Sequence, residues 1–341
     1  MSILEVQEEM AVKTSLIPKA YIWRRLHSLF GLWIVLFLIE HLLTNSQAAL
    51  LLGGNGKGFV DMVNAIHNLP YLEAIEIFLL GVPILVHGVL GVKYLFTAKS
   101  NSFRSDGSKP ALKEYGRNHA YTWQRITSWI LLVGIIGHVA KFRFIQYPVS
   151  VNQGLGSAYF VRLDVDNGLY TVASRLGATL YDAEAIEQQQ RALKKHKDQS
   201  VQKLIESLSS QKASGFDRQT ANMLERAQSY EQKVAWVEAL GKRWPRPHQV
   251  IAATENFGTA SLLSVRDTFK SPIYVGLYTI FVLAAVFHAF NGFWTFLITW
   301  GVVLRVASQR AMARFSIALM LLIGFLGLAA IWGTYLLNLK T

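Results

Sequence analysis

Five stretches of the chain are apolar over the length of a membrane helix. They cover roughly residues 26–45, 76–97, 126–146, 273–300 and 315–338. Because a bilayer core requires about 20 consecutive apolar residues in helical form, each stretch predicts a membrane-spanning helix. The alternating segments of a transmembrane barrel are absent from the sequence, and helices satisfy their own backbone polar groups. The pattern therefore predicts a bundle of five transmembrane helices.

Residues 148–270 interrupt this pattern, because they contain no apolar run of membrane length. A strand, an Asn-Gly turn and a second strand are predicted by YFVRLDVDNGLYTVASRLGATLY. Two helices are predicted by AEAIEQQQRALKKHKDQSVQKLIESLSSQK and by GFDRQTANMLERAQSYEQKVAWVEALG, the second ending near Gly241 ahead of two prolines. We therefore expect an all-α membrane protein with an inserted small α+β extramembrane domain.

Composition agrees with a membrane protein, since 52% of the 341 residues are hydrophobic and only 16% are charged. The net charge of +12 indicates contact with anionic headgroups of membrane lipid rather than with nucleic acid. The chain has no cysteine, so it can form no disulfide and can supply no thiolate ligand to zinc or to an iron–sulfur cluster.

Lysine and arginine in the short loops predict the orientation of the helices. The stretch 99–125 holds six basic and two acidic residues, and Arg305, Arg310 and Arg314 precede the last helix. Loops rich in these residues stay on the cytoplasmic side, whereas the connection 46–75 offers only Lys57. We expect a cytoplasmic N-terminal segment at 1–25, an extracytoplasmic insertion at 148–270 and an outer C-terminus.

Four of the nine histidines lie inside the predicted spans, one on each of the first four: His41, His87, His138 and His288. An ionisable group inside a membrane is costly and normally faces the bundle interior with a partner. At about 1.5 Å of rise per residue, His41 and His138 lie about 5 Å inside the outer edge, and His87 and His288 about 17 to 24 Å inside it. Two histidines at one depth on different helices can ligate both faces of one haem iron.

Glycines accompany these histidines at helical spacing. In HGVLG and HAFNG a glycine follows four residues after the histidine, at Gly91 and Gly292, and Gly134 lies four residues before His138. A glycine on the same helix face leaves room for a flat group such as haem. The alternative is that these glycines only allow helices to approach closely.

The chain resembles the cytochrome b membrane anchor of succinate dehydrogenase and fumarate reductase, in its single-polypeptide, five-helix, two-haem form. The resemblance covers roughly 20–147 and 271–338 and rests on RRLHSLFGLWIVLFLIEHLLTNS, EIFLLGVPILVHGVLGVKYLFTAK, QRITSWILLVGIIGHV and FHAFNGFWTFLITWG. It implies that His41 and His138 bind a distal haem b, and that His87 and His288 bind a proximal haem b. The insertion is far longer than the usual loop of that family.

The resemblance also implies partners and a location. A flavoprotein subunit and an iron–sulfur subunit would dock on the cytoplasmic face of a bacterial inner membrane, and electrons from succinate would reach a quinone, expected to be menaquinone, through two haems b. The chain would then divide into a cytoplasmic segment (1–25), three helices (26–147), the extracytoplasmic domain (148–270) and two helices (271–341).

Two sets of supporting residues are expected on the same basis. Residues at the inner ends of the first and third helices could hold haem propionates, although arginines there often only anchor a helix at the headgroups: Arg24, Arg25, His27, Ser28, Trp123, Gln124 and Arg125. Acids near the outer level could pass protons to a quinone, or could simply be solvated at the interface: Glu40, Asp61, Glu73 and Glu76.

Three alternatives remain open at this point. The chain could be the b-type haem anchor of another membrane dehydrogenase, such as formate dehydrogenase or hydrogenase. It could be a bc-type cytochrome b, although only His27 and His41 show the ligand spacing of that class on one helix. It could also be a haem-free, proton-coupled transporter that uses intramembrane histidines as proton relays.

Overall fold

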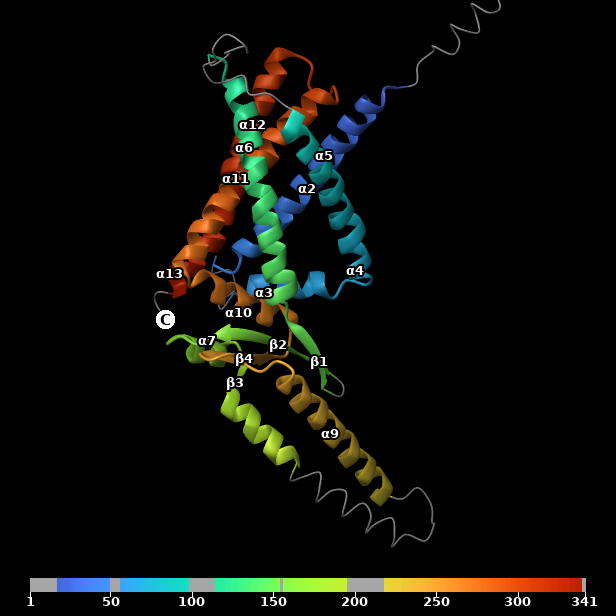
Figure 1. Cartoon of the computed structure of the whole chain (residues 1–341), viewed down its shortest axis with the longest axis vertical. Coiled ribbons are helices and arrows are strands. Elements are labelled where there is room, and N and C mark those ends of the chain that lie inside the picture. The colour runs from blue at the N-terminus through green and yellow to red at the C-terminus, as the bar shows by residue number, and fades with distance from the viewer. Residues whose placement is uncertain (1–16, 50–55, 98–113, 154–155, 195–217, 339–341) are drawn as a thin grey trace, which may run out of the picture. The chain divides into compact units, whose positions relative to one another are not determined.

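The computed structural model of the chain describes residues 17–49, 56–97, 114–153, 156–194 and 218–338. They form two compact units, each built from several parts of the chain (Figure 1). The first unit is Met1–Leu43, Pro70–Ile135 and Ile280–Leu326, and the second is Thr44–Leu69, Ile136–Thr279 and Gly327–Thr341.

Within the described residues, five helices are long and apolar enough to cross a membrane, which confirms the predicted fold class. Each begins earlier than the apolar stretch alone predicted. The first four spans are α2 (Lys19–Ser46), α4 to α5 through a π-helical segment (Leu72–Ile75, Glu76–Gly81, Val82–Thr97), α6 with a π-helical end (Gly116–Val139, Ala140–Ile145) and α11 (Pro272–Thr299). The fifth is α12 (Val306–Leu328), continued by a π-helical turn (Ala329–Gly333) and by α13 (Thr334–Asn338).

Apolar side chains of the first unit point outward as well as inward, as expected for helices whose solvent is lipid. Leu85, Val133 and Phe325 are 65%, 72% and 62% exposed. Helix contact in lipid relies on close packing and hydrogen bonds between helices. A methyl group at Gly134 would collide with the ring of Phe281, so α6 and α11 meet through this glycine. The contact indicates that Gly134 serves to let α6 and α11 approach each other closely.

A proline and a tryptophan join α2 to the second span. Pro83 has no N–H to donate to the carbonyl of Leu79, four residues earlier, and the π-helical segment Glu76–Gly81 lies just before it. The indole nitrogen of Trp33 donates to that same carbonyl. The irregular turn before His87 is therefore held by a side chain of the neighbouring helix.

The second unit contains a four-stranded antiparallel sheet with the order β1-β2-β4-β3. Its central strands, β2 and β4, pair in a register that places Val161 opposite Ala252. The strands are β1 (Val149–Gln153), β2 (Gly156–Asp164), β3 (Thr179–Tyr181) and β4 (Gln249–Thr254).

Alternation along the strands builds two hydrophobic layers, one on each face of this sheet. One layer joins the sheet to α7 (Leu169–Arg175) and α10 (Phe257–Phe269), and consists of Val161, Leu163, Leu169, Val250, Ala252, Ala260 and Leu263. The other joins the sheet to the helix at 183–194 and to α9 (Arg218–Gly241), and consists of Val151, Phe160, Ile186, Leu240, Ile251 and Ala253. The insertion is thus a helix–sheet–helix sandwich with two buried layers.

The predicted hairpin around the Asn-Gly turn is wrong. The chain turns at Asn167 and Gly168, but the next element is helix α7 and not a strand. Leu169 and Ala173 lie one helical turn apart on one face of α7, and both are buried where that face covers the sheet. The strand that pairs with β2 comes from 249–254, far along the sequence.

The two predicted helices of the insertion are present where the structure describes them. The first begins at Ala183 and is described to Lys194, and the remainder of the predicted range, with His196, lies outside the described residues. The second, α9, ends at Gly241 as predicted. The prolines at 245 and 247 follow within one turn and cannot continue a helix.

The connection 46–75 contains a helix that the sequence did not predict, α3 (Lys57–His67). Its Phe59 is buried, and its Asn64 Oδ1 accepts a hydrogen bond from the amide of Gly258 at 2.7 Å. A Cβ at Gly258 would lie 2.5 Å from the carbonyl oxygen of Val60. Helices α3 and α10 therefore meet backbone to backbone at this glycine (Figure 1).

A charged network fixes α10 to the loop after β2. Arg266 donates two hydrogen bonds to Asp166, at 2.7 and 2.8 Å, and Lys270 contacts Asp166 at 3.3 Å and Asp267 at 2.7 Å. Burial alone would raise the pKa of Asp166, but these two cations outweigh it and lower the pKa to about 2. Burial raises the pKa of Asp267, and Lys270 only partly offsets this.

We predict that Gly258→Ala weakens the packing of α3 on α10, because the new methyl group must displace the carbonyl of Val60. Overpacking of this kind costs about 1–3 kcal/mol. The measurement is the hydrogen-exchange protection of the α3 and α10 amides in the purified full chain. Gly276→Ala is the matched control, since nothing lies within 4 Å of a Cβ at that helical position. Equal protection in both variants would contradict the prediction.

We predict that the Asp166 network stabilises α10 only while Asp166 is ionised. Because its pKa in the folded chain is depressed to about 2, this stabilisation is present above the ordinary pKa of aspartate and is lost as the pH falls through the folded value. Asp166→Asn should reduce α10 hydrogen-exchange protection at neutral pH by ~1 kcal/mol, a figure that allows for solvent screening. The difference should shrink as the pH falls from about 5 and should vanish only below pH 2. Glu187→Gln, which breaks an exposed pair with Arg191, should have little effect at either pH.

Candidate functional site

Three histidines from three helices gather in the first unit. The rings of His87, on α5, and His288, on α11, have centroids 6.2 Å apart and planes at 83°. His27, on α2, stacks on His87 with a centroid distance of 4.0 Å and an interplanar angle of 9°. The sequence placed His87 and His288 at one depth, and the structure brings these two rings together. His27 was expected only at the periphery of the site.

Hydrogen bonding fixes the protonated nitrogen of His87. Its Nδ1 lies 2.9 Å from the backbone carbonyl oxygen of His27. A carbonyl oxygen only accepts hydrogen bonds, so Nδ1 carries the proton and a neutral ring keeps the lone pair on Nε2. Nε2 is the nitrogen left to bind a metal.

The same reasoning applies to His288, whose Nδ1 lies 3.4 Å from the hydroxyl oxygens of Thr127 and Ser128. Those hydroxyls already donate to the carbonyls of Trp123, at 2.8 Å, and Gln124, at 2.7 Å. Their oxygens can therefore only accept at His288, which places the proton on Nδ1 and again leaves Nε2 with a lone pair. Helix α6 supplies the groups that orient this ring.

Gln124 holds the backbone of α11 beside His288. Its side-chain nitrogen donates to the carbonyl of His288 at 3.0 Å, and its side-chain oxygen accepts from Asn291 at 2.7 Å. A Cβ at Gly292 would lie 3.7 Å from the same amide group. Gln124 was expected near a haem propionate, which stays a prediction; in the structure its side chain links α6 to α11.

A close approach of α2 to His87 was missed in the sequence. A Cβ at Gly31 would lie 2.9 Å from Cε1 and 3.1 Å from Nδ1 of His87. Gly31 follows His27 by four residues in HSLFG, the spacing that also separates Gly91 from His87. The repeated spacing was the signal that could have identified both His27 and Gly31.

The two histidines of the predicted outer level belong to different units. His41 lies on α2 in the first unit, where it stacks on Phe37 at 5.3 Å. His138 lies on α6 in the second unit, with its Nδ1 3.3 Å from the hydroxyl of Tyr278 and its ring 5.3 Å from Phe142. Their pairing stays a prediction from the sequence.

The arginines expected at the inner helix ends have protein partners in the first unit. Arg25 donates to the carbonyl of Thr299 and lies over the rings of Tyr21 and Trp300, at 4.8 and 5.1 Å. Arg125 donates to the carbonyl of Leu95 at 3.3 Å. Their described contacts are those of helix anchors. Of the other residues expected near haem propionates, Arg24 and Trp123 are exposed and Ser28 is half-buried.

The acids expected near a quinone lie on three separate helices. Glu40 is exposed on α2, and Glu73 is exposed in α4. Both belong to the first unit, whereas Asp61 belongs to the second, where it forms an ion pair with Lys57 one turn earlier in α3. An exposed pair of this kind is worth little to stability.

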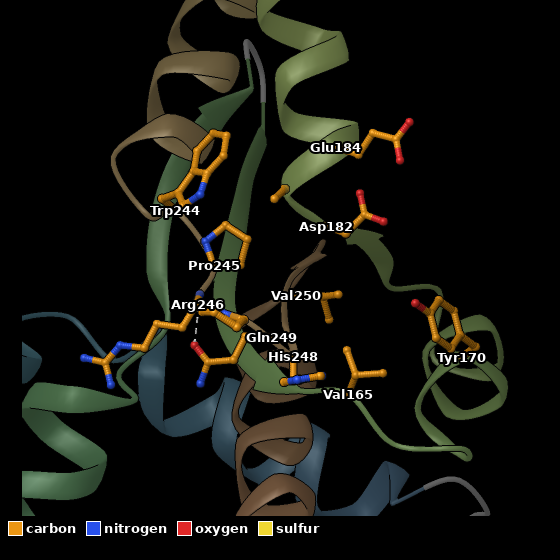
Figure 2. A pocket seen from close by; sticks show the side chains of 12 residues that line it. Val165, Tyr170, Asp182, Glu184, Trp244, Pro245, Arg246, His248, Gln249 and Val250 are labelled. Atoms are coloured by element: carbon orange, nitrogen blue, oxygen red, sulfur yellow. Dashed lines mark hydrogen bonds between the residues drawn. The ribbon is translucent and has the colours of Figure 1, made fainter.

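The second unit contains a cleft of about 490 Å³ in the extramembrane domain. Figure 2 shows Trp244 and Pro245 on one side of it and Asp182 and Glu184 on the other. His248, at its base, has a backbone φ of 64°, a value that few residues other than glycine adopt. No group of three or more metal-binding side chains occurs here or elsewhere among the described residues.

The fold and the site together define a class: a five-helix membrane protein whose histidines face one another across neighbouring helices. The chain is 24% identical over 315 residues to the succinate dehydrogenase cytochrome b558 subunit of Bacillus subtilis (strain 168), with 92% of this chain and 96% of the relative covered. No protein-family model and no solved structure matches the chain. The similarity confirms the resemblance to the cytochrome b subunit of succinate dehydrogenase.

We predict that Gly31→Ala disturbs His87, because the added methyl group would lie 2.9 Å from its ring. The purified chain should retain less haem b, or its reduced absorption band should shift, since a tilted imidazole is a poorer axial ligand. Gly88→Ala is the matched control, because it adds the same group next to His87 at a position with nothing within 4 Å. A Gly31→Ala chain with the spectrum and haem content of the control would overturn this role of Gly31.

Proposed function

We propose that the chain is the dihaem cytochrome b subunit of a succinate:quinone oxidoreductase. It would anchor a flavoprotein subunit and an iron–sulfur subunit at the membrane and connect them to a quinone through two b haems. The observation that carries the proposal is the facing pair His87 and His288, each with its Nδ1 proton engaged and its Nε2 left for iron. The similarity to a cytochrome b558 subunit over almost the whole chain supports it.

The geometry of this pair fits bis-histidine ligation. A metal–nitrogen bond of about 2 Å on each side, with about 1 Å from each nitrogen to its ring centre, gives a centroid separation of about 6 Å. The rings of His87 and His288 are 6.2 Å apart. A haem iron needs only two protein ligands, because the porphyrin supplies four nitrogens, so a pair of histidines is sufficient. When bound, haem b supplies a reversible one-electron carrier within the membrane.

The protein residues around the pair have separate tasks under this proposal. The His27 carbonyl holds the proton on His87 Nδ1, and the hydroxyls of Thr127 and Ser128 do the same for His288. Engagement of the second nitrogen fixes ring orientation and raises ligand basicity, as in other metal sites. The stacked His27 ring shields one face of His87.

A second haem b would be ligated by His41 and His138, at the outer level. This assignment rests on their common depth in the sequence and on the family resemblance. The hydroxyl of Tyr278, 3.3 Å from His138 Nδ1, could orient that imidazole as the hydroxyls of α6 orient His288. The quinone, expected to be menaquinone, would react nearby, with Glu40, Glu73 and Asp61 as candidates for proton transfer.

The proposal of two haems is tested by single substitutions in the whole complex. We predict that His87→Ala and His288→Ala remove the same haem, because one iron loses one of its two axial ligands. His41→Ala and His138→Ala should both remove the other haem. The measurement is haem content with the reduced-minus-oxidised spectrum, and His119→Ala, at an exposed position, is the control. Loss of one common haem in His41→Ala and His87→Ala would refute the pairing. A variant that loses the flavoprotein subunit but keeps both haems would show that anchoring of the partners does not depend on haem ligation.

The orientation is proposed from the basic loops, with the N-terminus in the cytoplasm and 148–270 outside. We predict that protease added to intact spheroplasts cleaves within 148–270, because only an outer domain is accessible there. Inverted membrane vesicles should protect the same region. Cleavage in the vesicles together with resistance in spheroplasts would reverse the topology.

A further inference from the structure

A second cleft, of about 320 Å³, lies where α6 leaves the membrane. Three of its six lining residues are basic, and we call it the cationic cleft: Ile145, Gln146, Tyr147, Arg162, Lys242 and Arg243. Ile145 is the last residue of the π-helical end of α6, and Gln146 and Tyr147 follow it. Arg162 comes from β2, and Lys242 and Arg243 follow α9. All of these residues belong to the second unit, so the cleft is formed within one compact body.

The positive charges of the cationic cleft are not neutralised within the described residues. No carboxylate there lies within ion-pair distance of Arg162, Lys242 or Arg243. Among the described residues, the Arg162 side chain donates only to the backbone carbonyls of Arg243, at 3.5 Å, and Trp244, at 3.3 Å. Its Nε is buried and has no hydrogen-bond partner among those residues.

The two arginines also repel each other. Burial lowers the pKa of Arg243, and the neighbouring charge of Arg162 lowers it further. Asp267 accepts a hydrogen bond from the side-chain nitrogen of Gln146, a lining residue, at 3.4 Å, but Lys270 already pairs with Asp267 at 2.7 Å. Like charges brought together in a partly buried position are unfavourable unless an anion binds between them. The arrangement therefore points to an anionic ligand.

The surroundings of the cleft are those of a membrane surface. Phe144 and Ile145, at the end of α6, are 77% and 76% exposed. The guanidinium of Arg143 lies 4.4 Å from the ring centre of Tyr147, and the ammonium of Lys141 lies 4.2 Å from that of Tyr274. Aromatic and basic side chains concentrate at the headgroup level of a bilayer. An apolar surface and an anion site thus lie side by side at that level.

We propose that the cationic cleft binds the phosphate group of an anionic phospholipid, whose acyl chains lie against Phe144 and Ile145. Guanidinium groups match phosphate oxygens with paired N–H donors, and Lys242 adds a point charge at the exposed rim. A free phosphate ion has the same headgroup chemistry but gains nothing from the apolar residues. The bound lipid ties the extramembrane domain to the membrane through β2 and the end of α9.

The test measures binding of two lipids that differ in charge to the full chain in a neutral detergent. Native mass spectrometry should detect phosphatidylglycerol bound in preference to phosphatidylcholine. Each basic residue at a membrane surface contributes about fivefold in affinity for anionic lipid, so Arg162→Gln with Arg243→Gln should weaken phosphatidylglycerol binding by about 30-fold. Lys242→Gln, at an exposed position that leaves the fold intact, should weaken it by about fivefold.

Two further pairs of substitutions serve as a charge-matched control and as a test that separates a lipid from a free phosphate. Arg191→Gln with Arg246→Gln removes the same charge from exposed positions of the same domain and should leave binding unchanged. Phe144→Ser with Ile145→Ser should weaken phosphatidylglycerol but not its water-soluble headgroup, glycerophosphoglycerol. Equal binding of the two lipids, or equal losses in the control, would overturn the proposal. Inorganic phosphate that binds as tightly as the lipid would assign the cleft to a free anion and also overturn it.

Discussion

A neutral imidazole has one nitrogen that must donate and one that must accept, and this constraint organises the centre of the first unit. In a membrane no water is available for either role, so both nitrogens need partners from the protein or from a ligand. The donors of His87 and His288 are satisfied by the His27 carbonyl and by two hydroxyls of α6. The accepting nitrogens are the ones that the proposed haem iron would bind, and residues of four helices contribute to this arrangement.

Small residues and backbone groups make that arrangement possible. Gly31 lets α2 approach the ring of His87, and Gly134 lets α6 approach α11. Gln124 then fixes the backbone of α11 at His288 itself. Because lipid gives helices no hydrophobic reason to associate, these close contacts and hydrogen bonds determine which helices are neighbours. The rings of His87 and His288 are therefore positioned by residues of neighbouring helices.

The extramembrane domain follows different rules, because water is its solvent. Two apolar layers pack on opposite faces of one sheet, and buried charges are paired, as Asp166 is with Arg266. Arg162 and Arg243 depart from this pattern at the edge where α6 ends. Under the lipid proposal this is the edge that faces the headgroups, where an unpaired cation can find a partner outside the protein.

The sequence by itself determined the five spans, the α+β insertion, the end of α9 at Gly241 and the common depth at which the rings of His87 and His288 meet, because hydrophobic length and helical rise depend only on local order. It predicted a strand where α7 forms, and it missed α3, since both elements owe their form to burial against distant partners. The partner of β2 is a strand that begins near residue 249, and no local pattern specifies such a pairing. Only the tertiary structure decided that His27 stacks on His87 and that three cations gather at the end of α6. Each of these arrangements joins residues from separate helices or strands, whose side chains meet only after the chain has folded.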